Sequence, residues 1–346
     1  MNKKKKILFV LKARNIAYGK SFGLVNSCNF VANALNNNGV EAKIVEVIDG
    51  NGIDKEVYNF RPDIVIIEAY FATPEKIEEL ISLPRYKDIF WTIRSHSEIP
   101  FFANESICIE WTKKYWELTK EHDNLSISSN TMDFVEQIKD SLNIKIDYLP
   151  NIYCPNKNIK YDLSFKDDNT LHVGLFGALR PLKNHLIQAL AAISFANLNN
   201  KTLHLHINAT RLEQRAEPVL KNLEALFQGT KHKLIKHDWL SYEETIKLVR
   251  KMDFTMQVSL SESFNLVAAD SVWNNVPVVG SYEIEWLNFL YKAKPTKLNS
   301  ILLKMFIAYY GQFIGLQYLN LLNLKIHNRF ALTNWLDWIN VRSCRK

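Results

Sequence analysis

LHVGLFGALRPLKN, Leu171–Asn184, is the stretch of sequence that decides the fold. Its apolar first half predicts a buried strand, and a helical pattern follows over His185–Leu198. Gly177 lies in the turn between the two, where a residue without a side chain lets the backbone approach a ligand closely. Arg180 and Lys183 place cations beside a helix N-terminus, a combination that suits a diphosphate. The alternative for this stretch taken alone is an ordinary turn between strand and helix with two surface cations.

The same alternation of strand and helix patterns runs along the rest of the chain. Before this stretch, apolar runs predict the strands of a first sheet: Ile7–Leu11, Ala42–Val47, Asp63–Ala69, Ile89–Arg94, Leu125–Ser129 and Ile146–Asn151. After it, a second sheet is predicted from Leu203–Ala209, His232–Leu240, Phe254–Ser259 and Val276–Ser281. Such an alternation is typical of parallel, doubly wound sheets. We therefore expect an α/β protein with two Rossmann-like domains that face each other across a cleft.

The domain limits follow from the same patterns. The first domain is predicted over residues 1–151 and the second over residues 170–295. Residues 152–169 carry a proline, several Asn and mixed charge without a clear period, so they are predicted to be the linker. After Gly280 the pattern becomes helical, and residues 296–346 are expected to form a helical tail that packs partly on the first domain.

Two acidic residues mark the loop and helix between the last two predicted strands. In SESFNLVAADSVWNNVPVVGS, Ser261–Ser281, Glu262 lies in the loop and Asp270 lies in the helix. Their spacing is a little over two helical turns, so a helix that begins near Glu262 would direct both carboxylates to one side. Carboxylates beside a cationic phosphate site suit the hydroxyl groups of a sugar and a ribose. Taken alone, such a pair is usually a solvated helix face.

The first domain offers its own polar residues at the carboxyl end of a predicted strand. Arg94, His96 and Glu98 stand at or just beyond that end, where parallel sheets bind ligands. We expect His96 to face the ligand, and Arg94 and Glu98 to lie on the acceptor side with Tyr18 and Gly19 of the first loop. Ordinary loop residues are the alternative for all of them. The glycine spacing of the first loop does not match the dinucleotide fingerprint.

Composition and charge narrow the class of protein. The 346 residues are 47% hydrophobic and 23% charged, which excludes a disordered or collagen-like chain. Four cysteines without CxxC spacing, and a lysine-rich start that leads directly into an apolar strand, favour a cytoplasmic protein. Residues 291–346 hold nine Lys/Arg and one acid, so they carry +8 while residues 1–290 carry −1. Such a basic segment can contact anionic lipid or nucleic acid, although a solvated helix face is commoner.

One segment of the tail raises the question of a membrane span. Met305–Leu324 holds no charged residue over twenty positions, which is long enough to cross a bilayer. It includes Gln312, Gln317, Asn320 and Asn323, each of which is costly in lipid. We expect helices that pack on the core, with at most one surface resting on a bilayer.

The quoted motifs together resemble a known family. The two sheets, GALRPLKN (Gly177–Asn184) and ESFNLVAAD followed by NNVPVVGS are similar to the nucleotide-binding half of GT-B-fold glycosyltransferases. The resemblance is greatest to the retaining family-4 type with its E-x7-E motif, in a subgroup of phage and bacterial sequences. Asp270 stands where the family has its second Glu, and Asn275 stands where Gly is usual. Many members carry a phosphate-binding Arg at the position of Ala178, so Arg180 is the candidate for that charge.

The resemblance implies roles for the matching positions. Lys183 and Arg180 would hold the donor diphosphate, and Asp270 would accept hydrogen bonds from the ribose. Glu262 and His96 would contact the donor sugar as the catalytic residues. The other implied donor contacts lie in loops and turns after strands of the second domain: Gly177, Asn208, Arg211, Ser263, Phe264 and Asn265.

The leading hypothesis is a retaining glycosyltransferase that uses a nucleoside diphosphate sugar, with UDP or GDP expected, and neither metal nor cofactor. The sequence has no Asp-x-Asp motif, and His204 and His206, which alternate on one strand, are interpreted as structural. The expected acceptor is a cell-surface or lipid-linked glycan, with peripheral membrane contact through the basic tail. The alternative acceptor is a hydroxymethylated DNA base, which the neutral residues 1–290 disfavour. A sugar-nucleotide epimerase and a non-catalytic binder of sugar nucleotide or nucleic acid are the other classes considered.

Overall fold

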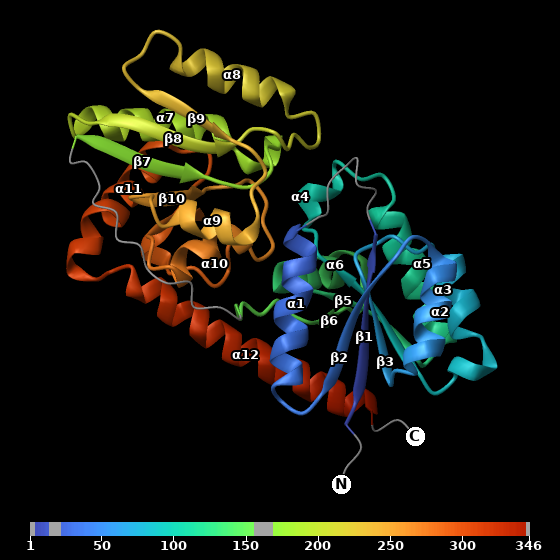
Figure 1. Cartoon of the computed structure of the whole chain (residues 1–346). Coiled ribbons are helices and arrows are strands. Elements are labelled where there is room, and N and C mark those ends of the chain that lie inside the picture. Colours follow the sequence, from blue (N-terminus) through green and yellow to red (C-terminus); the bar gives the residue numbers. More distant parts are fainter. Residues whose placement is uncertain (1–3, 14–21, 156–168, 344–346) are drawn as a thin grey trace. The chain divides into compact units, whose positions relative to one another are not determined.

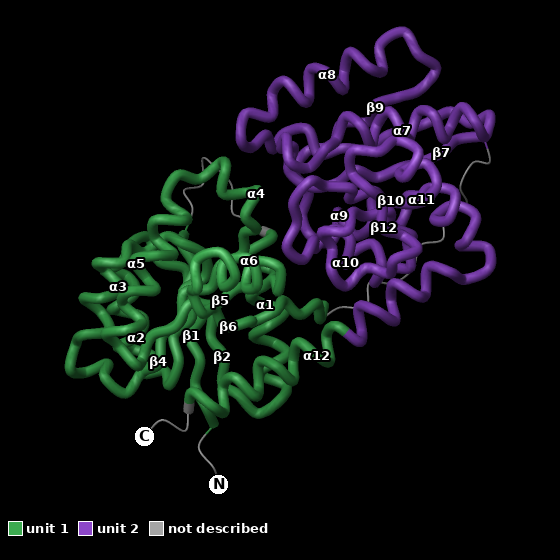
Figure 2. Tube along the Cα trace, turned by 180° about the vertical axis from the view of Figure 1, so that it is seen from behind, with its two compact units in different colours: residues 1–156, 327–346 green, residues 157–326 purple. Residues whose placement is uncertain are grey.

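A computed structural model describes residues 4–13, 22–155 and 169–343 of the chain. The chain divides into two compact units, which Figure 2 colours separately: unit 1 is residues 1–156 with 327–346, and unit 2 is residues 157–326. Each unit is built on a six-stranded parallel sheet, and helices alternate with the strands (Figure 1). The expected α/β class and the two doubly wound sheets are thus confirmed.

Unit 1 has the strand order β2-β1-β3-β4-β5-β6. Its strands are β1 (Lys6–Lys12), β2 (Glu41–Val47), β3 (Ile64–Glu68), β4 (Phe90–Ser95), β5 (Leu125–Ser129) and β6 (Asp147–Tyr148). Its helices are α1 (Phe22–Asn36), α2 (Gly50–Phe60), α3 (Pro74–Ile81), α4 (Ile99–Phe102), α5 (Cys108–Glu121) and α6 (Met132–Leu142). Every residue of β3 and β4 is buried, which explains why β3 is apolar up to its last residue, Glu68.

One face of the unit 1 sheet is covered by residues from both ends of the sequence. Its core joins Phe9 and Ile66 of the sheet to Val31 of α1 and to Trp335 of α12 (Tyr318–Ser343). The Trp335 ring lies 5.9 Å from the Phe9 ring, and its Nε1 donates to the carbonyl of Pro150 at 2.7 Å. The second half of α12 is therefore an integral part of the unit 1 core.

Unit 2 has the strand order β12-β11-β10-β7-β8-β9. Its strands are β7 (Thr170–Leu175), β8 (Thr202–Asn208), β9 (Lys233–His237), β10 (Phe254–Gln257), β11 (Val278–Ser281) and β12 (Lys292–Ala293). Its helices before α12 are α7 (His185–Leu198), α8 (Glu217–Phe227), α9 (Tyr242–Val249), α10 (Leu266–Trp273) and α11 (Leu298–Gly311). The chain order reverses between β7 and β10, and ligands of open α/β sheets bind at the carboxyl ends of such a strand pair.

The uncharged run Met305–Leu324 is divided among three elements. It covers the end of α11, the short 3-10 helix η5 (Gln312–Ile314) and the start of α12. Gly315 follows η5 with a positive φ of 79°, a conformation that glycine adopts without strain. Within the described residues, no helix has the length and apolar character needed to cross a membrane.

Candidate active site

The site in unit 2 is centred on a pair of oppositely charged side chains. Lys183 lies in the turn after β7, and Glu262 lies in the loop after β10. The Lys183 Nζ donates to Glu262 Oε1, and these side chains are only 13% and 9% exposed. The two strands are neighbours at the point where the chain order reverses. The structure therefore brings a cation and a carboxylate together where this type of sheet binds ligands.

Hydrogen bonds hold the two loops against each other. The N–H of Leu260 donates to the carbonyl of Leu182 at 2.8 Å. Gln188 of α7 bridges the same loops, since its Nε2 donates to the Lys183 carbonyl at 2.8 Å and its Oε1 accepts from Val258 N–H at 2.8 Å. The place of Lys183 beside the Glu262 loop thus depends on the backbone as well as on the ion pair.

Burial affects the charge of the groups around Lys183. It lowers the pKa of Lys183, and the nearby Arg180 acts in the same direction, while Glu262 opposes both. Burial also lowers the pKa of His185 to about 3, with help from the charges of Lys183 and Arg180. His185 at the start of α7 is therefore neutral at physiological pH, and Lys183 and Arg180 supply the positive charge here.

Two arginines of the site share a carboxylate that sequence reasoning missed. Glu213 Oε1 accepts from Arg211 Nε at 2.6 Å, and Glu213 Oε2 lies 3.4 Å from Arg180 Nε. Their segments run parallel, because Leu179 and Leu212 form an isolated β-bridge. The Arg211 guanidinium also lies 4.4 Å from the centroid of the Trp239 ring. Glu213 therefore orients both expected phosphate-side cations.

Gly177 and Asn208 are joined directly. The N–H of Gly177 donates to Asn208 Oδ1 at 2.9 Å, and Asn208 Nδ2 donates to the carbonyl of Asp238 at 3.2 Å. Gly177 has a φ of +109°, which side-chain-bearing residues rarely adopt, although a Cβ there would meet only Val267 Cγ2, at an ordinary contact distance of 3.9 Å. Asn208 is 6% exposed, so its side chain holds the turn after β7 in place.

The residues after Glu262 differ from the sequence expectation in one respect. Helix α10 begins at Leu266, four residues beyond Glu262, so the argument from helical spacing for the carboxylate pair was wrong. Asn265 has a φ of 60°, and its side chain caps α10 by accepting from Ala268 N–H at 2.9 Å. The helix starts late because this capping residue adopts a left-handed conformation. Asp270 is buried within α10.

Ser263 and Phe264 complete the expected donor contacts. Ser263 is half-buried in the loop before α10. Phe264 is buried, its ring lies 5.8 Å from the Trp286 ring, and its carbonyl accepts from Trp286 Nε1 at 2.7 Å. The Phe264 side chain is therefore part of the packing that supports the loop.

In unit 1, the expected residues Arg94 and His96 belong to a buried polar network. Arg94 Nη1 donates to both carboxylate oxygens of Glu68 at 3.2 Å, its Nε donates to the Leu149 carbonyl at 2.9 Å, and its Nη2 donates to Asn151 Oδ1 at 2.6 Å. Glu68 Oε2 is also bonded to His96 Nε2. Arg94 and Glu68 are fully buried. All three nitrogens of the Arg94 guanidinium therefore donate to protein groups. Arg94 holds the Glu68 carboxylate, and this carboxylate positions His96.

The charges in this network are strongly coupled. Burial alone would raise the pKa of Glu68, but Arg94 and His96 outweigh it and hold that pKa below its usual range. Burial lowers the pKa of His96, Arg94 adds to this, and Glu68 opposes it. Burial and Glu68 together raise the pKa of Cys28 well above its usual value. The network therefore contains an ionised Arg94–Glu68 pair beside a neutral thiol.

Sequence reasoning missed Glu68 and Asn151, although one signal was visible. Glu68 is a single acidic residue at the end of an otherwise apolar, buried strand, and its register partner in β4 is Arg94. Ala69, the next residue, has a φ of 71°, a strained conformation of the kind found near functional sites. Glu98 is buried at the start of α4. Tyr18 and Gly19 lie outside the described residues.

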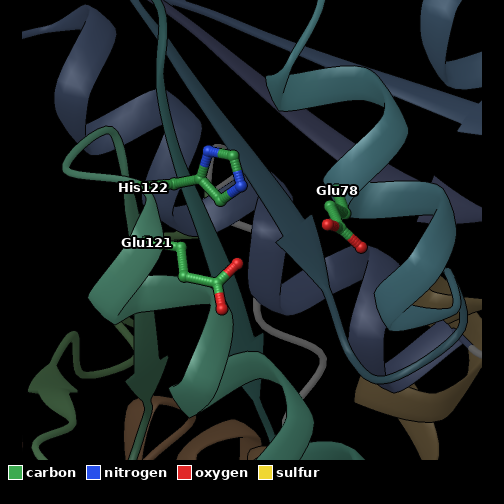
Figure 3. A group of neighbouring side chains, drawn as sticks. All are labelled: Glu78, Glu121 and His122. Carbon is green, nitrogen blue, oxygen red and sulfur yellow. The ribbon is translucent and has the colours of Figure 1, made fainter.

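One further cluster among the described residues has the composition of a metal site. Figure 3 shows Glu78 of α3 with Glu121 and His122 at the end of α5, whose ligand atoms lie within 4.8 Å of one another. Both carboxylates are exposed, and exposed acidic groups often gather without an ion. Nothing else in the described structure points to an ion there, so the cluster has no part in the function proposed below.

Known proteins resemble this chain in fold but not in sequence. No protein-family model and no curated protein sequence matches this chain. Solved structures do match it. The N-terminal domain of Candida albicans trehalose-6-phosphate phosphatase gives a TM-score of 0.66 at 12% identity, over 99% of this chain and 97% of that one. A UDP-forming α,α-trehalose-phosphate synthase from Burkholderia xenovorans gives 0.63 at 14% identity, over 99% of each chain.

A third match is to part of a longer protein. S. aureus TarM, in a mutant form complexed with fondaparinux, α-GlcNAc-glycerol and UDP, gives a TM-score of 0.58 at 11% identity. The match covers 80% of this chain and 55% of TarM, so the chain spans about half of that protein. At these identities the likeness is one of fold. The chain has the fold of the GT-B glycosyltransferases, as its sequence motifs predict.

Proposed function

We propose that this chain is a retaining glycosyltransferase that moves a sugar from a nucleoside diphosphate sugar to an acceptor hydroxyl. The observation that carries the proposal is the buried pair of Lys183 and Glu262 at the carboxyl ends of β7 and β10. A cation and a carboxylate held together there suit the two parts of such a donor, because phosphate oxygens accept from ammonium groups and sugar hydroxyls donate to carboxylates. The GT-B fold supports the same assignment.

The proposed reaction uses the charges of the site. The bond between the anomeric carbon and the diphosphate oxygen breaks, a bond from that carbon to the acceptor oxygen forms on the same face, and the acceptor proton passes to the departing diphosphate. Negative charge grows on the departing diphosphate. Lys183 and Arg180 would stabilise that charge more in the transition state than in the bound donor. Glu262 would hold a donor-sugar hydroxyl, and Asp270 would accept from the ribose.

The proposed substrates are a nucleotide-sugar donor and a glycan acceptor. A UDP-sugar is the first choice of donor because two of the matched structures are named as UDP-forming or as containing UDP, and a GDP-sugar is the second. A glycan, on the cell surface or lipid-linked, is the proposed acceptor. Residues 1–290 carry a net charge of −1, whereas surfaces that follow DNA are basic, so hydroxymethylated DNA is kept as a test substrate.

The thiols agree with a cytoplasmic place of action. Cys28, Cys108 and Cys154 are free, and the first two are buried. Thiols that persist without disulfide pairing are typical of reducing compartments. We therefore include cytoplasmic location in the proposal.

The proposal is tested by donor binding. Wild-type protein is screened with UDP-, GDP-, ADP- and TDP-sugars by thermal shift, and donor hydrolysis is followed as release of the nucleoside diphosphate. Lys183→Gln should lose the shift, while the control Lys55→Gln, at an exposed position of α2, should keep it. Product anomeric configuration, read by NMR, tests retention. The proposal fails if no nucleotide sugar stabilises the wild type, or if Lys183→Gln binds the donor equally well.

A further inference from the structure

Large apolar side chains lie in solvent where α7 and α11 contact each other in unit 2. Leu198 is 66% exposed, Phe313 is 75% exposed and Ile314 is 78% exposed. Leu303 and Tyr310, seven residues apart on α11, are also exposed and share one side of that helix. We call these five residues the α11 face.

Contacts between elements show that the α11 face is one continuous surface. Helices α7 and α11 pack together. The Tyr310 hydroxyl donates to Asn199 Oδ1, and Asn199 directly follows Leu198. The Tyr309 ring lies 6.3 Å from the Phe313 ring, which connects α11 to η5. The exposed apolar groups therefore lie side by side along the end of α7, α11 and η5.

The α11 face is not the side that α11 uses to join its own unit. Ile301, Met305 and Ala308 are completely buried and form the inner side of the helix. The Phe306 ring packs on the Phe195 ring of α7 at 4.9 Å. A surface helix usually carries polar side chains opposite its buried side. Helix α11 carries large apolar side chains on both its inner and its outer side. The outer side therefore has a use other than the folding of unit 2.

The two segments of sequence that carry the α11 face hold charged residues of a single sign. Residues 184–201 and 286–326 include no Asp or Glu. They do include lysines: Lys201, Lys292, Lys294, Lys297, Lys304 and Lys325. Ordinary exposed helices of the same chain mix the two signs, since α5 pairs Lys114 with Glu110 and Lys120 with Glu117. This sector of unit 2 is therefore complementary to an anionic partner.

Two of these lysines contact aromatic residues that adjoin the α11 face. The Lys304 Nζ donates to the carbonyl of Phe289 at 3.4 Å, and the Phe289 side chain is itself 69% exposed. The Lys201 ammonium lies 5.8 Å from the centroid of the Tyr309 ring. Apolar groups bordered by lysines and tyrosine are suited to the boundary between acyl chains and headgroups.

We propose that the α11 face docks on an anionic lipid bilayer. Phe313 and Ile314 enter the acyl boundary, Tyr310 lies at headgroup level, and the lysines contact lipid phosphates. A second copy of this chain is a poorer occupant, because two acid-free, lysine-bordered surfaces would repel each other. The inference concerns a partner of unit 2 and does not depend on sugar transfer.

Vesicle binding tests the proposal. The full chain is sedimented at physiological salt with vesicles of phosphatidylcholine and phosphatidylglycerol, and with vesicles of phosphatidylcholine alone. Wild-type protein should bind the anionic vesicles and not the neutral ones. The double variant Phe313→Ser/Ile314→Ser should bind at least about tenfold more weakly, because large apolar side chains no longer leave water. The matched control is Ile48→Ser, at an 81% exposed position of unit 1.

Charge is tested separately. Lys304→Glu should weaken binding to the anionic vesicles by roughly tenfold or more, because each basic residue near such a surface contributes to the affinity. Lys55→Glu changes the overall charge equally at an exposed position of unit 1 and should bind as the wild type does.

Three results would overturn the proposal. One is wild-type protein that does not sediment with anionic vesicles, and another is a double variant that binds them as tightly as the Ile48→Ser control. The third is a lipid-free dimer, seen by sedimentation velocity, that the double variant dissociates while vesicle binding is absent. That result would make the α11 face an interface between copies. An unchanged thermal unfolding midpoint of the double variant shows that its fold is intact.

Discussion

Glu68→Gln should destabilise unit 1 far more than the small change in atoms suggests. Glu68 and Arg94 are fully buried, and Arg94 Nη1 donates to both Glu68 oxygens at 3.2 Å. The other acceptors of Arg94, the Leu149 carbonyl and Asn151 Oδ1, are neutral. The variant would therefore leave a buried guanidinium without an opposite charge. Removing one partner of a buried ion pair costs about 3–5 kcal/mol, a large share of the roughly 5–15 kcal/mol by which domains are stable.

The assay is urea unfolding followed by tryptophan fluorescence, which the buried Trp91 and Trp335 report for unit 1. The control is Glu117→Gln, the same substitution in an exposed pair with Lys120 on α5. Exposed pairs contribute about 0–1 kcal/mol, so the control should unfold nearly as the wild type does.

A second substitution separates loss of charge balance from general damage. Arg94→Met combined with Glu68→Gln removes both members of the pair, so the double variant should recover part of the stability that Glu68→Gln loses. The pKa of His96 should fall in Glu68→Gln, because Glu68 is the group that opposes its lowering by burial. Equal unfolding midpoints for Glu68→Gln and Glu117→Gln would refute the reasoning.

Further predictions concern the site and the pH dependence. Glu262→Gln should abolish most sugar transfer in a folded protein and lower the unfolding midpoint, because the largely buried Lys183 loses its carboxylate partner; transfer at the wild-type rate would contradict the catalytic role of Glu262. Asp270→Asn should weaken donor binding about tenfold to hundredfold, because a hydrogen bond to a charged group contributes roughly 1.5–3 kcal/mol. If calorimetry shows an unchanged donor affinity, Asp270 does not bind the ribose. Burial lowers the pKa of His206 to about 3. The contribution of this group to the free energy of unfolding is therefore complete above the ordinary histidine pKa and is lost as the pH falls toward 3. Unfolding free energy should therefore drop by about 2 kcal/mol for this group between pH 7 and pH 5, and a flat profile in urea titrations would count against it.

The fold was predictable because buried strands and amphipathic helices leave strong patterns. Helix α7 and strand β5 have the bounds that their apolar periods predict. Strand β12 was not predicted, because a strand of two residues has no period to detect.

The site was predictable where a local motif carries it and not where strand neighbours create it. Lys183 and Glu262 belong to quoted motifs. The partnership of Glu68 with Arg94 depends on the register between β3 and β4, and Glu213 reaches Arg180 through the bridge of Leu179 with Leu212. Such pairings join residues far apart in sequence, so a single sequence does not reveal them.

The shared helix α12 has a consequence for synthesis on the ribosome. The sheet of unit 1 is made first, but the part of α12 that carries Trp335 belongs to residues 327–346 and is made only after all of unit 2. At translation rates of about 5–20 residues per second, the delay is roughly ten to thirty seconds. During that time the nascent sheet exposes the apolar surface around Phe9 that Trp335 later covers. Unit 2 can therefore complete its fold during translation before unit 1 does. A chaperone that binds apolar strands would bind the incomplete sheet of unit 1 in this interval.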